Sequence, residues 1–320
     1  MRWVIDAYLA QPEAQSFESH VTVFWFTDPD HTAHSFEVGH PTTVAALQAV
    51  DTQLGRLVDH FEGGPYAGQT NYLVTSDHGF SSMVGRENPL STLFRIAQKL
   101  RRPPTDFILA GFGMHLRNLD ASHLPTVVET LHRSDWVGAI FTRDADAQAT
   151  EGAVAGTLPL RLAHLRHARA GDVVAVPRWS AAQNDYGVAG VTHVPGAAGH
   201  GSSSPFDIHT ACIGYGPDFK TGHRGALPTH NVDLTATLAA LAGVAPWDTL
   251  EGRVLAEGLR GGPDVDGSAV PQRTYESEAS YDDGFRYRTV LTEHRVGPYR
   301  YFTQTETTRQ TETTRAAPQE

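Results

Sequence analysis

Aspartate and histidine side chains cluster at the ends of three short apolar runs, and this pattern constrains the fold more than any other feature of the chain. The clusters contain Asp30, His34, Asp77, His78 and His200. The first two follow the apolar run 21–26, the next two follow the run 72–74, and the last precedes an apolar run that includes Ile213. Open α/β sheets bind their ligands outside the carboxyl ends of parallel strands. The sequence therefore predicts an α/β fold in which these five side chains meet at one sheet edge.

These residue types are ligands of divalent cations. Zn²⁺ binds imidazole nitrogen and carboxylate oxygen, commonly in a tetrahedral arrangement. Each Asp-His pair taken singly is also typical of a turn that caps a helix, and a chain with seventeen histidines places some beside carboxylates by chance. The three clusters together favour a site for two divalent cations. Zn²⁺ is the expected metal, with Mn²⁺ or Fe²⁺ as alternatives.

Three motifs in this order resemble the alkaline phosphatase superfamily, and most closely its type I phosphodiesterase/nucleotide pyrophosphatase family. The family carries Pro-Asp with a histidine four residues later, then Asp-His-Gly, then a late His-Gly in a glycine-rich loop. In this chain the motifs are Pro29-Asp30 with His34, Asp77-His78-Gly79, and His200-Gly201. The later segments GYGPDFKTG and HNVDLTATLAALAGV also resemble the family, so that the resemblance covers about residues 1–260.

The resemblance implies a metal-dependent hydrolase of phosphodiester or phosphomonoester bonds in a small-molecule phosphate ester. It assigns three ligands to one metal, Asp30, His34 and His200, and two to a second, incomplete site, Asp77 and His78. His31 lies between two ligands and is expected to orient a metal-bound imidazole. Ser81, Ser202 and Ser203 are candidate donors to a substrate phosphate, although serine after glycine is also typical of loops.

The nucleophile is the main departure from the family. There, an earlier strand ends in a metal-binding Asp, and a Thr or Ser nucleophile follows it; residues 1–29 contain no such pattern. Asp6 lies in a predicted helix, and Thr42 and Thr43 are expected to cap the next one. We therefore expect an N-terminally incomplete fold whose activity is impaired or absent, with slow direct attack by water as the remaining route.

Two other functions stay open at this point. A non-catalytic remnant that binds metal or phosphate ligands would account for the absence of the nucleophile. Another activity of the superfamily, such as that of a phosphomutase or a sulfatase, would use similar ligands. The sulfatase is disfavoured because its Cys/Ser-x-Pro-x-Arg motif does not occur in the chain.

Strand-like and helical segments alternate along the chain, which predicts a mostly parallel sheet covered by helices on both faces, as in alkaline phosphatase-like folds. Residues 1–85 and 196–260 are expected to form the metal-binding α/β core. Residues 86–195 are expected to form a small inserted cap together with further core elements. Apolar residues at helical spacing over 44–61 predict a long amphipathic helix after the first ligand cluster.

The C-terminal region differs in composition. Residues 261–303 are expected to form a linker followed by a β-hairpin, because two alternating segments flank a turn at Gly297 and Pro298. Residues 304–320 repeat QTETTR and lack core-forming side chains, which predicts a disordered tail.

Composition limits the partners of the protein. The net charge of −11 disfavours a nucleic-acid-binding surface, because phosphate contacts need clustered Lys and Arg. No apolar stretch approaches the ~18 residues of a membrane-spanning helix, and the first residues lack a signal-peptide pattern. The chain as given is therefore expected in the cytoplasm, although relatives in the family are often exported. The single cysteine, Cys212, is expected in a buried strand.

Overall fold

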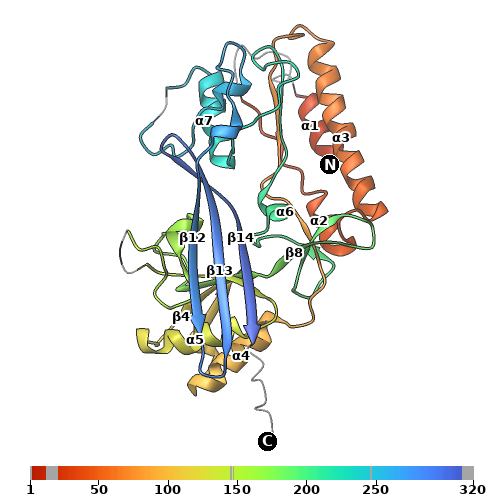
Figure 1. The fold of residues 1–320 in the computed structure, drawn as a ribbon. Helices are drawn as coiled ribbons and strands as arrows, with labels where there is room; N and C mark the ends of the chain where they lie inside the picture. Colours follow the sequence, from red (N-terminus) through yellow and green to blue (C-terminus); the bar gives the residue numbers. More distant parts are fainter. Residues whose placement is uncertain (1, 12–20, 145, 147, 246, 312–320) are drawn as a thin grey trace, which may run out of the picture.

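The computed structural model describes residues 2–11, 21–144, 146, 148–245 and 247–311 (Figure 1). Its largest sheet has the strand order β3-β4-β7-β5-β6. The strands are β3 (Phe107–Ala110), β4 (Gly113–Leu116), β5 (Val137–Thr142), β6 (Leu158–Pro159) and β7 (Val173–Pro177). The helices α4 (Pro89–Leu100) and α5 (Leu124–His132) pack against one face of this sheet. The predicted α/β class, with sheets flanked by helices, is confirmed.

Alternating side chains of β5 explain how this sheet is covered on both faces. Val137 and Ile140 pack with α4 and α5, whereas Ala139 and Phe141 pack on the opposite face. Successive side chains of a regular strand point to opposite faces. Val137 and Ile140 are three residues apart and would face opposite ways in a regular strand. A register shift between them lets both face the helices. The sheet is therefore buried on both sides.

A long three-stranded sheet covers the second face. It consists of β12 (Gln272–Ser280), β13 (Phe285–Val296) and β14 (Tyr299–Thr311). Tyr275 and Leu291 pack there among residues of β5 and β7. In Figure 1 these strands run from the end that carries α4 and α5 to the end that carries α7. The predicted hairpin is confirmed, and Gly297 adopts a positive φ of 58° at its turn.

The predicted disordered tail is wrong for its first residues, because β14 continues through Thr311. Thr305 is buried against the protein while Glu306 and Thr308 point outward, so the QTETTR repeat has the two-residue period of a strand. Threonine is β-branched and suits a half-buried strand even without a large apolar side chain. Residues 312–320 lie outside the described residues.

The ligand-bearing part of the chain contains smaller sheets and several helices. The helices are α1 (Arg2–Leu9), α2 (Asp30–Phe36), α3 (Pro41–Glu62), α6 (Pro205–Ile208) and α7 (Asn231–Leu241). The strands are β1 (Tyr72–Thr75), β2 (Ser81–Met83), β8 (Trp179–Gln183), β9 (Ala189–Thr192), β10 (Ala198–Gly199) and β11 (Cys212–Tyr215). β1 pairs with β11, and the other four form a sheet of order β10-β2-β9-β8. None of the described helices has both the length and the apolar character that crossing a membrane requires.

The expectation of mostly parallel pairing is wrong. Eight of the ten pairings between described strands are antiparallel, and two, β2 with β9 and β5 with β6, are parallel. A short turn joins β3 to β4, and a connection of that length permits antiparallel pairing alone. Several strands follow one another without an intervening helix, which the alternation of apolar runs does not reveal.

Two expected strands are more exposed than their composition predicts. Residues 21–26 adopt no regular secondary structure, and Val23 and Trp25 are 76% and 68% exposed. Cys212 is exposed rather than buried, because β11 belongs to a sheet with one described partner strand. Ile213 in the same strand is also exposed. The ligand-bearing part therefore has little apolar cover on this sheet.

Candidate metal centre

Two of the five candidate ligands project from one short helix. Asp30 is the first residue of α2, and His34 lies one turn later on the same face. A carboxylate in the first turn is favoured by the partial positive charge at a helix N-terminus. Thr32 Oγ1 donates to Asp28 Oδ1 over 2.6 Å and fixes the turn that leads into the helix. The local sequence thus presents a carboxylate and an imidazole side by side.

The other three candidate ligands lie in loops. Asp77 and His78 follow β1 in the turn that leads to β2. Asn231, the first residue of α7, donates through Nδ2 to the carbonyl oxygens of Ser76 (3.2 Å) and Asp77 (2.9 Å) and holds this turn. His200 follows β10, which pairs with β2. The pairing of β2 with β10 therefore brings the two loops together.

The carboxylate of Asp30 is the meeting point of three imidazoles. Its Oδ1 lies 3.4 Å from His34 Nε2, 3.6 Å from His200 Nε2 and 3.8 Å from His78 Nε2. The rings of His78 and His200 stack with their centroids 3.4 Å apart. Asp77 joins the cluster through His78, whose Nε2 lies 3.5 Å from Asp77 Oδ2. The structure thus brings together all five residues that the sequence singles out.

This donor set fits a bound cation. Asp30 Oδ1 is buried and has no hydrogen-bond partner. His34 Nδ1 lies 3.1 Å from the Ala198 oxygen, and His78 Nδ1 lies 2.9 Å from the Gly79 oxygen. A carbonyl oxygen only accepts, so each Nδ1 carries a proton, and in the neutral ring each Nε2 then turns a lone pair towards the carboxylate. A cation placed between these atoms removes the repulsion, and imidazole with carboxylate is a ligand set that Zn²⁺ takes.

The surroundings of His200 keep its imidazole suited to metal binding. Burial lowers the pKa of His200, and the neighbouring His78 lowers it further, which favours the neutral, ligating form. Phe80 packs against the cluster, with ring centroids 4.9 Å from His34 and 5.4 Å from His200. Half of the Asp77 side chain is exposed, so the centre opens to solvent on that side. Phe80 is a site residue that sequence reasoning missed, although it lies two positions after His78.

His31 does not join the cluster. Its side chain is exposed on α2, and the structure shows no contact between it and the five ligands within the described residues. The carbonyl oxygens of Ala198 and Gly79 instead orient the imidazoles of His34 and His78. The expected orienting role of His31 stays a prediction.

The candidate hydroxyl groups are engaged elsewhere. Ser81 and Ser202 donate to the Asp207 carboxylate, and Ser203 is bonded to Thr305. All three serines are buried. Their arrangement therefore differs from the expectation that they donate to a substrate phosphate, because the folded loops turn these side chains into the protein.

The two threonines after the first cluster lie in the first turn of α3. Thr43 Oγ1 donates to the Glu37 oxygen over 2.7 Å. The cap itself is His40, whose Nδ1 accepts from the Thr42 backbone nitrogen at 3.1 Å. Both threonines thus belong to the helix start, as expected, while the capping side chain is a neighbouring histidine.

The fold and the cluster define an α/β protein with an Asp/His centre of the kind that holds divalent cations. The family model of type I phosphodiesterases/nucleotide pyrophosphatases matches residues 2–201, a span that includes all five clustered side chains, and the chain belongs to this family. The resemblance seen in the sequence motifs is confirmed. No curated protein matches the chain.

Three solved structures are similar to part of the chain. Murine ectonucleotide pyrophosphatase/phosphodiesterase 5 is 17% identical, with a TM-score of 0.48, and the match covers 69% of this chain and 53% of that chain. An inactive form of the murine protein in complex with AMP gives the same values. The human protein of the same name is 16% identical, with a TM-score of 0.47 and the same coverage. The chain therefore spans about half the length of the solved structures that it matches.

Proposed function

We propose that this chain holds divalent cations at the Asp/His cluster and hydrolyses phosphodiester or phosphomonoester bonds in small molecules. The observation that supports it most is the state of Asp30 Oδ1, which is buried, accepts no hydrogen bond and faces three imidazole nitrogens. Membership of the phosphodiesterase/pyrophosphatase family gives the chemical class. Zn²⁺ is the metal that the ligand set favours.

The proposed metal ligands divide into two groups, and both lie close to the Asp30 carboxylate. Asp30, His34 and His200 would hold one ion, and Asp77 with His78 a second, less completely enclosed ion. When bound, such ions supply positive charge that stabilises a phosphoryl group in displacement and lower the pKa of water from 15.7 towards ~7. The chain's own contribution is to hold three imidazoles in fixed orientations around a carboxylate.

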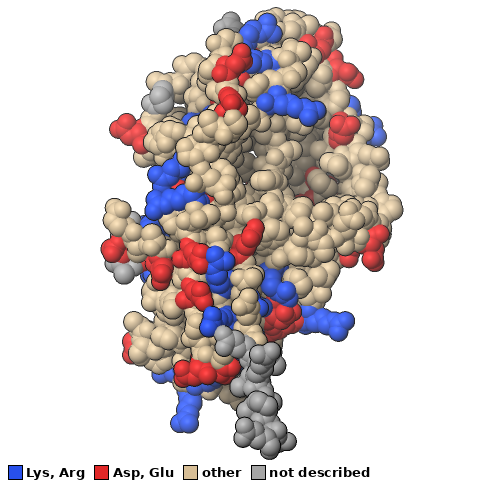
Figure 2. All heavy atoms as spheres, viewed as in Figure 1, with Lys and Arg blue, Asp and Glu red and all other residues tan. Residues whose placement is uncertain are grey.

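The distribution of surface charge supports a substrate that is attracted by the metal site and not by a basic surface. On the face shown in Figure 2, acidic and basic side chains are interspersed, with no continuous basic area. The chain also carries a net charge of −11. An anionic phosphate ester would therefore be attracted by local metal charge.

Hydroxyl groups near the candidate ligands are hydrogen-bonded to other side chains, which supports low activity and also a second, non-catalytic function. Ser81 and Ser202, near the ligands in sequence, donate to Asp207, and Thr32 donates to Asp28. With these hydroxyls engaged, water is the nucleophile that we assign to this chain, and we expect turnover to be slow. A non-catalytic protein that binds metal or phosphate ligands is the alternative that this observation favours, ahead of a phosphomutase.

Hydrolysis of bis-p-nitrophenyl phosphate and p-nitrophenyl phosphate, with Zn²⁺ or Mn²⁺ added, separates these functions. We expect slow, metal-dependent turnover that is lost in Asp30→Ala and His200→Ala. Asp51→Ala, an exposed carboxylate on α3, is the matched control and should retain the wild-type rate. Metal binding without turnover would identify the non-catalytic alternative, and absence of metal binding would refute both the hydrolase and the metal-binding form of that alternative.

A further inference from the structure

We infer that Asp207 is a positioning residue that holds the loop carrying His78 and the loop carrying His200 in a fixed relation. Asp207 lies on α6 and is 4% exposed. Its Oδ1 accepts from Ser81 Oγ. Its Oδ2 accepts from Ser202, both from the backbone nitrogen (2.9 Å) and from Oγ (2.6 Å). All three side-chain bonds therefore go to the two loops that carry candidate ligands.

The backbone of α6 strengthens the same connection. The Gly79 nitrogen donates to the Asp207 oxygen over 2.7 Å, and the Phe80 nitrogen donates to the Phe206 oxygen over 3.0 Å. A Cβ at Gly79 would overlap the Phe206 oxygen and lie 2.8 Å from the His209 oxygen. The close contact between α6 and the loop that carries His78 thus requires glycine directly after His78.

Short tethers join this carboxylate to the imidazoles. Ser81 follows His78 by three residues, and Ser202 follows His200 by two. Between them, the pairing of β2 with β10 sets Ser81 opposite Gly199. A shift of either tether would change the stacking of His78 on His200 and their approach to Asp30. Groups that orient metal ligands in this way typically change metal affinity by ~10–100-fold when removed.

The test measures metal affinity on the full chain and rests on the proposed metal site. Zn²⁺ affinity is measured by competition with a chromogenic chelator, and the Co²⁺-loaded protein gives an absorption spectrum that reports ligand geometry. We expect Asp207→Ala to weaken Zn²⁺ binding ~10–100-fold and to alter the Co²⁺ spectrum. Asp207→Asn keeps the shape and one acceptor oxygen, so its affinity should lie between those of Asp207→Ala and the wild type.

Asp106→Ala is the matched control for lost burial and charge. Asp106 is 6% exposed and accepts from Arg102 Nε (2.8 Å) and Asn118 Nδ2 (3.2 Å), in the region of β3 and β4. Its loss should lower the melting temperature of the metal-free protein as Asp207→Ala does, while Zn²⁺ affinity changes less than ~3-fold. A purely structural role for Asp207 predicts equal effects on affinity in both variants.

Each outcome decides between the proposals. Wild-type Zn²⁺ affinity in a folded Asp207→Ala protein would overturn the positioning role and leave the metal site standing. A wild-type chain that binds neither Zn²⁺ nor Co²⁺ would overturn the metal site and the positioning role together. If Asp207→Ala does not fold, Ser81→Ala and Ser202→Ala each remove one tether; a loss of at least ~3-fold in affinity supports the role, and unchanged affinity in both refutes it.

Discussion

The candidate ligands and the hydrophobic core lie in different regions of the chain. We term residues 21–85 and 196–245 the ligand region, and 86–195 with 272–311 the core region. Both clusters of buried apolar side chains belong to the core region, around the five-stranded sheet. In the ligand region, Ile213 is 59% exposed and lies beside other exposed apolar residues. Residues 86–195, expected as a cap together with further core elements, therefore supply most of the packing.

In the ligand region, where few apolar side chains pack together, hydrogen bonds hold the loops in place. Asp207 joins the two ligand loops, and Asn231 holds the turn that contains Asp77. Behind Asn231, the buried Asp233 accepts from the Arg253 nitrogen at 2.8 Å and from the Tyr301 hydroxyl at 3.1 Å. The position of the candidate metal centre thus depends on directed polar contacts rather than on a packed core.

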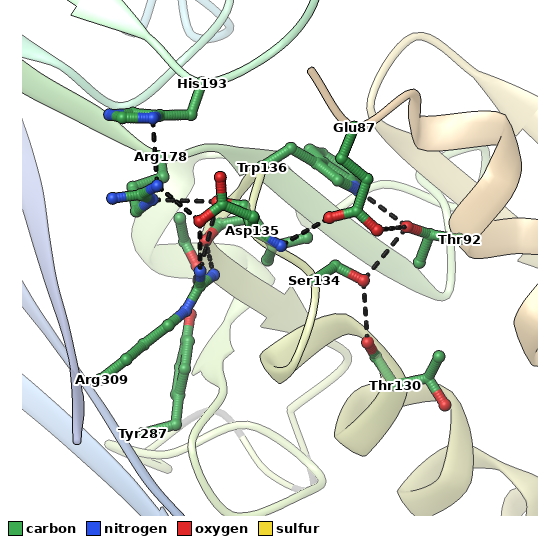
Figure 3. A network of polar contacts seen from close by, with 12 residues as sticks. Glu87, Thr92, Thr130, Ser134, Asp135, Trp136, Arg178, His193, Tyr287 and Arg309 are labelled. Carbon is green, nitrogen blue, oxygen red and sulfur yellow. Dashed lines mark hydrogen bonds and ion pairs between the residues drawn. The ribbon is translucent and has the colours of Figure 1, made fainter. Parts of the chain in front are cut away.

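Figure 3 shows a polar network within the core region, beside the points where the chain passes to the ligand region. The Asp135 nitrogen donates to Glu87 Oε2 over 2.6 Å, and Arg178 Nη2 donates to Asp135 Oδ1 over 2.7 Å. Arg178 Nη2 also lies 3.0 Å from His193 Nδ1, and Arg309 Nη1 donates to the Asp135 oxygen over 3.2 Å. Glu87 and His193 lie near the first and the last residue of the segment 86–195. The network therefore holds the core region in place near both points where the chain continues into the ligand region.

The largest effect should come from removing the shared carboxylate of the ligand region. We expect Asp30→Ala to weaken Zn²⁺ binding by roughly 1,000-fold, or ~4 kcal/mol, because three imidazoles lie around its Oδ1. The metal-free protein should lose no more than about 1 kcal/mol of stability, from the charge at the start of α2, because that oxygen is buried without a hydrogen bond. Chelator competition and thermal melting measure both quantities. A loss of affinity below tenfold would show that the carboxylate is not the centre of the site.

The core region should respond in the opposite way. Leu131 on α5 is 2% exposed within the apolar cluster, and Leu131→Ala should lower the free energy of unfolding by about 3 kcal/mol. Leu47 on α3, in the ligand region, is 55% exposed, and Leu47→Ala should change it by no more than about 0.5 kcal/mol. Urea titration of both variants gives the comparison. Equal losses would mean that the ligand region is as well packed as the core region.

The sequence indicates which candidate ligands cluster, but not which residues support them. Asp77 and His78 are adjacent, and Asp30 and His34 share one helix turn, so local motifs reveal them. Asp207 contributes through contacts across 126 residues to Ser81, and no local pattern marks that pairing. Strand direction was equally hidden, because apolar periodicity reports burial and not which strands become neighbours. The polar strand at 304–311 shows the same limit, since its partner β13 determines its fold.

Acid should destabilise the core region through His132. Burial lowers the pKa of His132 to about 3, and its ring stacks on Tyr287 with centroids 3.8 Å apart. The unfolded state takes up a proton near the ordinary pKa of ~6.5 while the folded state does not, so stability falls as pH drops below that value. At pH 5 the loss is about 2 kcal/mol, at ~1.4 kcal/mol per pH unit.

His132→Asn isolates this contribution. Other histidines with lowered pKa, including His164 and His230, add to the wild-type slope because burial also disfavours their charged forms. The variant should be less stable at pH 7, since His132 Nδ1 is bonded to the Tyr281 hydroxyl at 2.7 Å. Its stability should nevertheless fall less steeply between pH 7 and pH 5 than that of the wild type. Parallel slopes in urea titrations would exclude His132 as a source of the acid sensitivity.

The smallest effect is expected on the exposed sheet of the ligand region. Ile213 and Tyr215 point to the same face of β11 and are both exposed, so Ile213→Thr should change the free energy of unfolding by no more than about 0.5 kcal/mol. Light scattering of the concentrated protein should decrease, because exposed apolar patches promote association. A loss above 2 kcal/mol would require that this face is covered in solution. The contrast between a packed core region and an uncovered ligand region would then hold for the described residues alone and not for the protein in solution.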